Sequence, residues 1–444
     1  MKLKTFERGI HPSYNKELTA DKAVVKAGLP GRVIIPLSQH IGAPCEPVVK
    51  KGDEVSEGQK IGEATSFVSA PVHSSISGKV KDIVMHPHPS GARALAVVIE
   101  GDGETRDWES DGGGFDLDAL GPEEIRGLIR DAGIVGLGGA TFPTSVKLSP
   151  PKGSRIDSVI LNGCECEPFL TADHRIMVEE SEKVVLGLKA IMKTVGAGSG
   201  YIGIEDNKPD AVEAIKAAVS SLAPDIRIVL LETKYPQGAE KMLIDAVLGR
   251  KVPVGKLPLD VGVVVNNIGT AAAIYEAIRY RKPVIERVVT VSGNGVKEPK
   301  NLLVRIGTTF DEVISQCGGL VDGVEKEVLS GGPMMGVAQK TLEVPVVKGT
   351  SGITVLAGSE IKPATHKPCI RCASCVDACP MGLMPYKIAD MGRLGMTDEF
   401  KSWSGLACIE CGCCSFVCPA KRPLVQWIRV GKVRLREAER SSSK

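Results

Sequence analysis

The chain has 444 residues, of which 43% are hydrophobic and only 4% aromatic. This is enough for about three domains with largely aliphatic cores. The formal charge of +2 comes from 55 basic and 53 acidic residues, which gives no sign of nucleic-acid binding. No run approaches ~18 uninterrupted apolar residues, so no membrane-spanning helix is expected. Thirteen cysteines without an apolar leader in the first residues favour a reducing, cytoplasmic setting over a secreted disulfide protein.

Short strands and turns are predicted over residues 33–100. The segments 49–61 and 70–80 follow the pattern V-x-x-G-D-x-V-x-x-G-Q-x-I … A-P-V … G-x-V, which resembles the barrel-sandwich of biotinyl and lipoyl carriers. Those carriers attach their cofactor to a lysine at a hairpin tip, and residues 63–68 of this chain contain no lysine. We therefore predict a barrel-sandwich hybrid over residues 1–115 that carries no covalent cofactor.

The middle of the chain predicts helices packed over a mainly parallel sheet. A helix is expected over residues 122–133, where Pro122 suits the first turn and Ile125 and Ile129 share one face. Strand and helix patterns then alternate between residues 155 and 281. Strand patterns lie at 156–161, 201–204, 226–231 and 261–265, and helix patterns at 182–195, 207–222, 239–248 and 270–278. A Rossmann-like α/β domain is predicted over 116–285.

The last third divides into two units. Strand patterns at 287–293 and 302–306 flank a turn rich in Gly, Asn and Pro, and a capping-box pattern at 309–312 starts a short helix. A hairpin, a helix and a further strand suggest a β-grasp unit of the SLBB type over 286–350. Residues 351–444 hold most of the cysteines and a charged tail. The predicted fold class is thus multidomain, with α/β and α+β parts.

Two near-identical cysteine runs follow C-x2-C-x2-C-x3-C-P, the run of bacterial ferredoxins with two [4Fe–4S] clusters. Three thiolates two residues apart let one loop cover three corners of a cubane, and the fourth cysteine ligates the other cluster. The first cluster would be held by Cys369, Cys372, Cys375 and Cys418. The second would be held by Cys408, Cys411, Cys414 and Cys379. Structural zinc also uses C-x2-C pairs, but two copies of this run with a terminal proline favour a ferredoxin-like helical domain.

The glycine loop at 133–144 is not a dinucleotide fingerprint, because it follows a helix pattern and lacks the G-x-G-x-x-G spacing. Backbone N–H groups of such a loop can bind a phosphate. The loop is similar to the G-x-G-G-A-G-F-P-T segment in the flavoprotein subunit of respiratory NADH dehydrogenase. Residues 162–168, 235–238 and 265–270 resemble three further motifs of that family in the same order: N-x-D-E-x-E-P, Y-x-x-G and V-N-N-V-E-T. Thr141 and Cys164 depart from the family pattern.

This resemblance implies a non-covalent FMN site and an NAD(H) site. The glycine loop and a lysine would hold the FMN phosphate, through Gly136, Gly138, Gly139 and Lys147. Other residues would line the flavin: Asn162, Glu165, Tyr235, Gly238, Asn266, Asn267 and Thr270. Phe142 and Glu167 would contact the nicotinamide nucleotide. Hydride transfer to a flavin requires no acid–base pair, so we predict no catalytic side chain.

The order of parts resembles the RnfC family, the peripheral subunits of Rnf-type ferredoxin–NAD oxidoreductase complexes. A cobalamin reductase of similar parts lacks the leading barrel, and a sodium-pumping quinone reductase relative lacks the cluster domain. The resemblance implies an enzyme subunit that passes electrons between NAD(H), FMN and two [4Fe–4S] clusters. Its partners would be other subunits of an ion-translocating membrane complex and a ferredoxin or similar carrier. It would lie on the cytoplasmic side of the cell membrane.

A second reading from the same residues is an iron–sulfur relay and docking subunit. It would take electrons from a ferredoxin or a cytochrome, without bound FMN or activity towards NADH. Flavin absorption that NADH bleaches would separate the two readings. A biotin- or lipoyl-carrier protein, the third reading, is disfavoured by the missing lysine.

Overall fold

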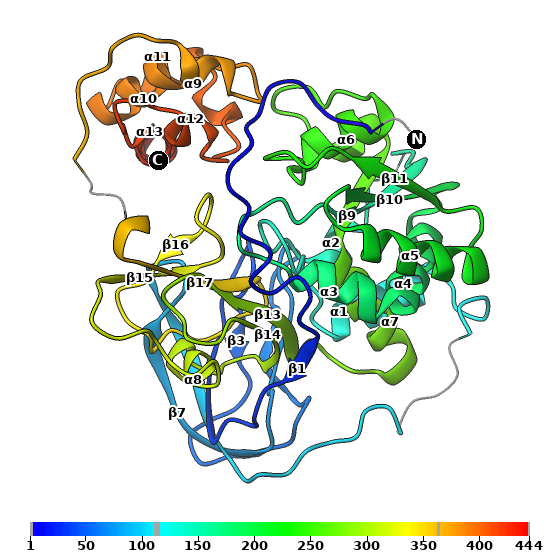
Figure 1. Cartoon of the computed structure of the whole chain (residues 1–444). Coiled ribbons are helices and arrows are strands. Elements are labelled where there is room, and N and C mark those ends of the chain that lie inside the picture. The colour runs from blue at the N-terminus through cyan, green and yellow to red at the C-terminus, as the bar shows by residue number, and fades with distance from the viewer. Residues whose placement is uncertain (1–2, 111–115, 152, 362–364, 443–444) are drawn as a thin grey trace.

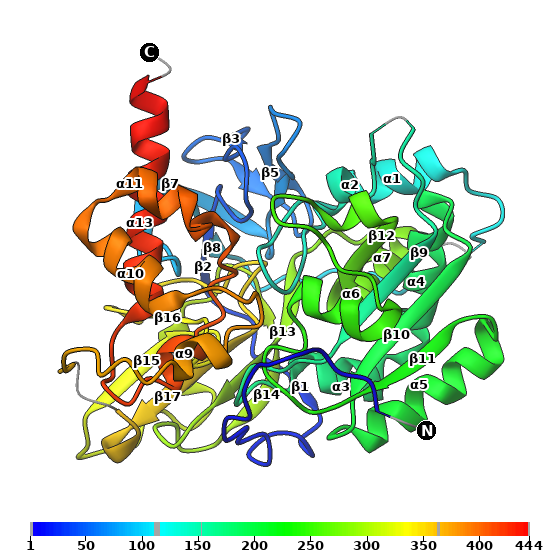
Figure 2. The ribbon, with the colours of Figure 1, turned by 90° about the horizontal axis from the view of Figure 1, so that it is seen from above.

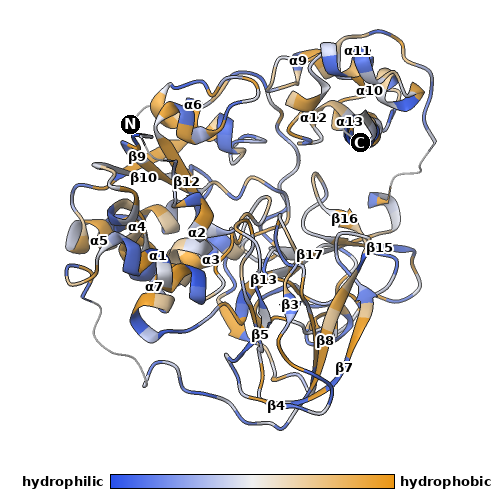
Figure 3. Cartoon of the chain, turned by 180° about the vertical axis from the view of Figure 1, so that it is seen from behind, coloured by the Kyte–Doolittle hydropathy of each residue, from blue (hydrophilic) through white to orange (hydrophobic). Residues whose placement is uncertain are grey.

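The computed structural model describes residues 3–110, 116–151, 153–361 and 365–442. Within these residues the strands form four sheets. Helices gather in two places, around the central parallel sheet and in the C-terminal domain (Figure 1). Hydrophobic residues concentrate along the central strands, whereas hydrophilic residues appear on the outward helices (Figure 3).

The N-terminal barrel consists of two small antiparallel sheets, paired in the orders β2-β8-β7-β4 and β3-β5-β6. Their strands are β2 (Arg32–Pro36), β3 (Glu46–Pro47), β4 (Glu54–Val55), β5 (Lys60–Glu63), β6 (Val72–His73), β7 (Gly78–Pro87) and β8 (Arg93–Gly101). Val33 and Ile35 both point inward, as strand alternation requires, and are fully buried with Ile61. The lysine-free segment 64–68 follows β5 and leaves Phe67 76% exposed.

The central domain has a four-stranded parallel sheet in the order β11-β10-β9-β12. Its strands are β9 (Ser158–Gly163), β10 (Ser199–Glu205), β11 (Arg227–Leu231) and β12 (Val263–Asn267). Its helices are α1 (Pro122–Asp131), α2 (Thr144–Lys147), α3 (Ala172–Glu179), α4 (Ser181–Val195), α5 (Pro209–Leu222), α6 (Glu240–Leu248) and α7 (Ile268–Tyr280). Val159 and Leu161 of β9 pack in the core with α4, α5 and α7, whereas Ile160 packs with α6 on the other face.

A six-stranded mixed sheet follows, in the order β1-β14-β13-β17-β15-β16. Its elements are β1 (Val24–Lys26), β13 (Glu286–Ser292), β14 (Lys300–Arg305), β15 (Lys326–Ser330), β16 (Val337–Ala338), β17 (Gly352–Ala357) and helix α8 (Phe310–Ser315). Thr309 caps α8 and accepts a hydrogen bond from the Glu312 N–H. β1 and β17 lie outside the range 286–350 predicted for this unit, and the domain boundaries stay a prediction.

The C-terminal domain is helical. It contains α9 (Ser374–Asp377), α10 (Pro385–Leu394), α11 (Thr397–Ser402), α12 (Cys413–Phe416) and α13 (Leu424–Ser442). Gly392 lets α10 approach α13 closely, because a Cβ there would lie 2.4 Å from the Trp427 carbonyl oxygen. The end of α13 projects from the body of the molecule (Figure 2). Over the described residues, no helix combines the length and the apolar character needed to span a membrane.

The first residues form an extended segment, Leu3–Lys26, which we call the N-terminal strap. It runs past the central domain and the C-terminal domain before it enters the mixed sheet as β1 (Figure 1). Lys4 bridges Leu231 in parallel, and Ile10 bridges Tyr235 in antiparallel fashion. The strap lies inside the range 1–115 predicted for the barrel, and its hydrogen bonds also connect it to the other three units.

Candidate functional site

The eight cysteines of the two runs line two separate cavities. One cavity is lined by the last cysteine of the first run and three of the second: Cys379, Cys408, Cys411 and Cys414. The other is lined by Cys369, Cys372, Cys375 and Cys418. We refer to them as the inner and the outer cysteine cavity. The chain thus brings each fourth cysteine to the opposite run, the grouping on which the crossed ligand prediction depends.

The two cysteine loops share one backbone conformation. Arg371 and Glu410 occupy equivalent positions and both have positive φ, +58° and +59°. The turn directs the Arg371 N–H to the sulfur of Cys369 at 3.4 Å and the Glu410 N–H to the sulfur of Cys408 at 3.3 Å. Hydrogen bonds to the cysteine sulfurs are one of the features that set the reduction potential of a bound cluster. Thiolates around a largely apolar cavity are suitable ligands for an iron–sulfur cluster.

The two loops differ in their surroundings. Cys369 and Cys372 are exposed, whereas Cys411 and Cys414 are buried. In the described part of the chain, no group of three or more His, Cys, Asp or Glu side chains is arranged to hold a single metal ion. The extra cysteine of the second run, Cys413, directs its sulfur to the Tyr235 carbonyl oxygen at 3.9 Å.

The glycine loop folds onto the N-terminus of α7. The Gly136 N–H donates to the Phe142 carbonyl at 2.9 Å, and the Leu137 N–H donates to the Thr270 hydroxyl at 2.9 Å. A Cβ at Gly138 would lie 2.9 Å from Nδ2 of Asn267. Gly138 is therefore needed for the close approach of loop and helix.

Three predicted flavin contacts lie at the carboxyl ends of neighbouring parallel strands. Asn162 is the last residue of β9 that pairs with β12, where Asn267 lies opposite it beside Asn266. Ligands of open α/β sheets bind outside the carboxyl ends of the strands. Asn162 donates to the Gly238 carbonyl at 2.8 Å. The amide nitrogen of Asn266 and both amide atoms of Gln237 are buried and have no hydrogen-bond partner in the described part of the chain, so these groups could bind a polar ligand.

Several predicted site residues are already engaged by the protein. Lys147, predicted to offset the FMN phosphate, forms an ion pair of 2.8 Å with Glu240. The carboxylate of Glu165 accepts the N–H groups of Asp173 and His174, at 2.8 and 3.0 Å, and so caps α3. Burial and the neighbouring Glu165 carboxylate raise the pKa of Asp173 to about 7. These contacts leave the predicted roles of Lys147 and Glu165 untested.

Tyr235 and Glu167 contact segments outside the central domain. The Tyr235 side chain is 1% exposed, and its hydroxyl donates to the Cys411 carbonyl at 2.8 Å. Glu167 accepts the N–H groups of Met334 and Met335 at 2.6 and 3.0 Å, and burial raises its pKa. Both residues were predicted beside the flavin or its nucleotide. Tyr235 thus connects the central domain to the second cysteine loop, and Glu167 connects it to the segment after β15.

Two neighbours of this junction were missed by the sequence analysis. Cys166 accepts the Gly238 N–H at 3.3 Å and packs with Tyr235, Cys411 and Met334. Lys16 of the strap donates to three carbonyls of the loop after β9. Cys166 belongs to a motif that the resemblance covered, whereas no local pattern marks Lys16.

Four family models match the chain. They are the RnfC barrel sandwich hybrid domain at 4–104, the Nuo51 FMN-binding domain at 129–276, the SLBB domain at 288–338 and the 4Fe-4S dicluster domain at 363–419. These matches confirm the predicted fold class: a barrel-sandwich, an α/β flavin-type domain, an SLBB unit and a two-cluster domain. They also support FMN and two [4Fe–4S] clusters as cofactors.

Two relatives are similar over nearly their whole length. The chain is 49% identical to the C subunit of the proton-translocating ferredoxin:NAD(+) oxidoreductase complex of Clostridium ljungdahlii, over 100% of this chain and 96% of the relative. It is 51% identical to the C subunit of the Na(+)-translocating complex of Acetobacterium woodii, over 96% of each. A solved NAD+-reducing [NiFe]-hydrogenase aligns with 72% of this chain and 66% of its own at 18% identity and a TM-score of 0.49. By its close similarity to these two relatives, the chain belongs to the RnfC family.

Proposed function

We propose that this chain is the electron-transfer subunit of an ion-translocating ferredoxin:NAD oxidoreductase complex. It passes electrons between NAD(H), FMN in the central domain and two [4Fe–4S] clusters in the C-terminal domain. Other subunits of the complex and a ferredoxin or similar carrier are its partners. Its position is peripheral, on the cytoplasmic side of the membrane.

One observation carries this proposal: a single turn contacts both candidate redox sites. In the turn Tyr235–Gly238, the Gly238 carbonyl accepts from Asn162 at the carboxyl end of β9. At its other end, Tyr235 donates to Cys411 at the inner cysteine cavity. The flavin-type site and the second cysteine loop are therefore joined through one short, buried segment.

The residues around the central site are suited to binding and orienting a flavin. When bound, FMN exchanges two electrons with NAD(H) and one electron at a time with the clusters. The glycine loop would offer backbone N–H groups to the phosphate. The amide nitrogen of Asn266 and both amide atoms of Gln237 lack partners among the described residues and would donate to or accept from polar flavin atoms. Lys147 would either leave Glu240 and contact the FMN phosphate, or contact the phosphate while it stays paired with Glu240.

The burial of the two cysteine cavities supports an order for the clusters. Tyr235 donates to the carbonyl of Cys411, a residue that lines the inner cavity, so the cluster there would be the neighbour of the flavin. The outer cavity includes the exposed Cys369 and Cys372, so its cluster would exchange electrons with a partner. This order connects NAD(H) at one end with the protein surface at the other.

One specific observation favours the alternative hypothesis, an iron–sulfur relay subunit without activity towards NADH. Glu167, the predicted nucleotide contact, is already held by two N–H groups. A Cβ at Gly332 would lie 2.2 Å from Cγ of Glu167, so the segment Gly332–Met335 closely covers this side chain. NADH contact at Glu167 would require that segment to move.

The experiment is an anaerobic reconstitution with iron, sulfide and FMN, followed by titration with NADH. We expect flavin absorption that NADH bleaches, and electron-spin signals from clusters that become reduced afterwards. If the clusters form but no flavin binds, or if NADH leaves the flavin oxidised, the relay reading replaces this one.

A further inference from the structure

Lys16 of the N-terminal strap is an unusual buried cation. It is 8% exposed, and its ammonium donates to the carbonyls of Glu165, Glu167 and Leu170 at 2.7, 3.0 and 2.5 Å. All three partners are neutral oxygens. A buried charge with neutral partners is costly, and burial together with the charge of Lys208 lowers its pKa. A structural role alone could be filled by a neutral donor.

The loop that Lys16 binds is strained. Glu165 and Phe169 have left-handed backbones, with φ of +46° and +69°, which side chains other than Gly rarely adopt. Such strain persists where surrounding contacts over-determine the conformation, and it concentrates at functional sites. Lys16 provides these contacts, because it draws together carbonyls from both ends of the segment Glu165–Leu170.

A second buried lysine binds the start of the same loop in a different way. Lys208 donates to the Cys164 carbonyl at 2.6 Å and forms an ion pair of 3.1 Å with the fully buried Glu205. Lys208 therefore has a carboxylate partner in direct contact, whereas the ammonium of Lys16 is hydrogen-bonded to carbonyls.

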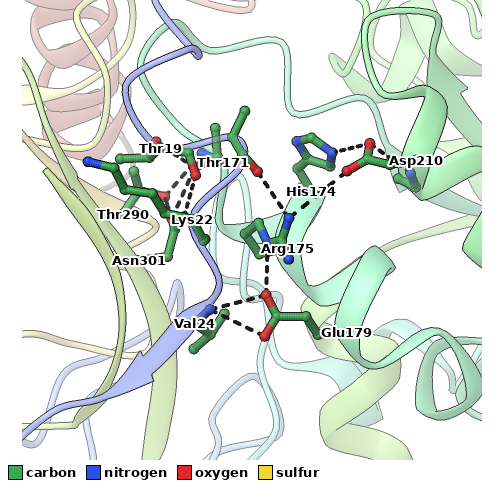
Figure 4. A network of polar contacts seen from close by, with 12 residues as sticks. Thr19, Lys22, Val24, Thr171, His174, Arg175, Glu179, Asp210, Thr290 and Asn301 are labelled. Atoms are coloured by element: carbon green, nitrogen blue, oxygen red, sulfur yellow. Dashed lines mark hydrogen bonds and ion pairs between the residues drawn. The ribbon is translucent and has the colours of Figure 1, made fainter.

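The residues of the strap that follow Lys16 in the sequence are held in place by several hydrogen bonds. Thr19 and Thr171 share a hydrogen bond of 2.7 Å, and Asn301 donates to the carbonyls of Thr19 and Lys22 (Figure 4). The Val24 N–H donates to the Glu179 carboxylate. Phe169 itself donates its N–H to the Tyr14 carbonyl at 2.8 Å, on the other side of Lys16. These contacts fix the place at which Lys16 enters the loop.

We propose that Lys16 is a positioning residue of the flavin site. It holds Glu165 and Phe169 in their left-handed backbone conformations, and its charge favours the reduced, more negative form of the flavin. The proposal rests on the proposed function, and it adds the strap to a site otherwise built from the central domain. No electron or proton passes through Lys16.

The test compares Lys16→Met, Lys16→Gln and Lys16→Arg with Lys22→Met in the full chain. Lys22 is a matched control, because it lies on the same strap and donates to the Pro299 carbonyl at an exposed position. FMN binding to the apoprotein is measured by quenching of flavin fluorescence, and the flavin midpoint potential by spectroelectrochemistry. Iron content and thermal unfolding are recorded for each variant.

We expect Lys16→Met to weaken FMN binding about tenfold or more, which is the usual effect of losing hydrogen bonds from a charged group, and to make the flavin potential more negative. Lys16→Gln keeps a neutral donor, so it should restore part of the affinity but not the potential. Lys16→Arg should restore both, and Lys22→Met should match the wild type.

Wild-type affinity and potential in Lys16→Met would overturn the proposal, even if its melting temperature fell. If Lys16→Met does not fold, a wild-type potential in folded Lys16→Gln overturns the role of the charge. A wild-type protein that binds no FMN would instead defeat the proposed function itself, before any variant is compared.

Discussion

The two cysteine loops of this chain have the same spacing and the same backbone turn, but their surroundings are opposite. The first loop places Cys369 and Cys372 at the surface, whereas the second buries Cys411 and Cys414. Only the second loop receives a hydrogen bond from Tyr235 of the central domain. The repeat in the sequence thus determines how each loop can bind a cluster, and the neighbouring domains determine what each cluster can exchange electrons with.

One pair of equivalent positions illustrates this difference. Arg371 in the first loop is exposed. Its counterpart Glu410 accepts from Lys432 and Arg429 at 2.7 and 2.8 Å, and Lys432 also donates to the Cys408 carbonyl at 2.6 Å. These hydrogen bonds hold the second loop against α13. The cluster of the second loop should therefore be the more rigidly held of the two.

The largest expected effect is the loss of one cluster on Cys379→Ser. Cys379 belongs to the first run but lines the inner cavity with the second, so the variant should lose the cluster of the second run. Iron should fall from about eight to about four atoms per chain, as counted chemically and followed by electron-spin spectra. Cys413→Ser is the control and should keep all the iron. Loss of the cluster at Cys369 instead would refute the crossed assignment.

A second prediction concerns a variant that loses the flavin but keeps both cysteine loops intact. Gly138→Val should displace Asn267, because even a Cβ there would lie 2.9 Å from its amide nitrogen. FMN content of the purified protein should fall at least about tenfold, as expected when overpacking costs about 1–3 kcal/mol. The clusters should persist in their separate domain. Gly127→Ala is the control, since a Cβ at this position of α1 meets open space. Equal flavin in Gly138→Val and wild type would show that the site lies elsewhere.

A smaller effect is expected from Tyr235→Phe, which removes the bond between the central domain and the second loop. The variant leaves the buried Cys411 carbonyl without this donor and should lower the free energy of unfolding by about 1–2 kcal/mol. Reduction of the clusters by NADH, followed by stopped-flow absorbance, should slow. Tyr201→Phe is the control, because that hydroxyl has only a 3.5 Å contact with Arg227. Unchanged reduction rates in Tyr235→Phe would remove this turn from the electron path.

The smallest expected effect is a difference in stability between variants of Glu410 and Arg371, the equivalent residues of the two cysteine loops. Burial opposes the ionisation of Glu410, but Lys432 and Arg429 outweigh it and hold its pKa below the usual range. Its contribution to stability should therefore be complete above the unfolded pKa of 4.5 and be lost as the pH falls through the lower folded value. Glu410→Gln should cost about 1 kcal/mol at pH 7 and little at low pH, measured by urea unfolding. Arg371→Gln should cost almost nothing at either pH.

The sequence was sufficient where a function depends on local spacing. Strand and helix patterns predicted the parallel sheet that carries Asn162 and Asn267, because alternation and helical periodicity are local properties. The cysteine spacing led to the same grouping as the two cavities. The barrel was likewise predicted from its paired turn pattern.

The sequence was insufficient where distant segments meet. The strap lies inside the range 1–115 predicted for the barrel, and nothing in its sequence indicated that β1 pairs with β14 or Ile10 with Tyr235. Short extended segments carry no sign of their partner, because any exposed edge offers the same hydrogen-bonding groups. For the same reason, no local pattern indicated that Lys16 donates to carbonyls of the loop after β9 or that Glu167 accepts the Met334 N–H.

The central claim is that electrons pass between the flavin site and the surface through the inner cluster first. It is tested most directly by rapid mixing of the reconstituted protein with NADH, followed by freeze-quench electron-spin spectra of wild type and Cys379→Ser. The account predicts that both clusters become reduced in the wild type. It also predicts that the outer cluster stays oxidised in the variant although the flavin is bleached. Reduction of the outer cluster at the wild-type rate in Cys379→Ser would contradict it.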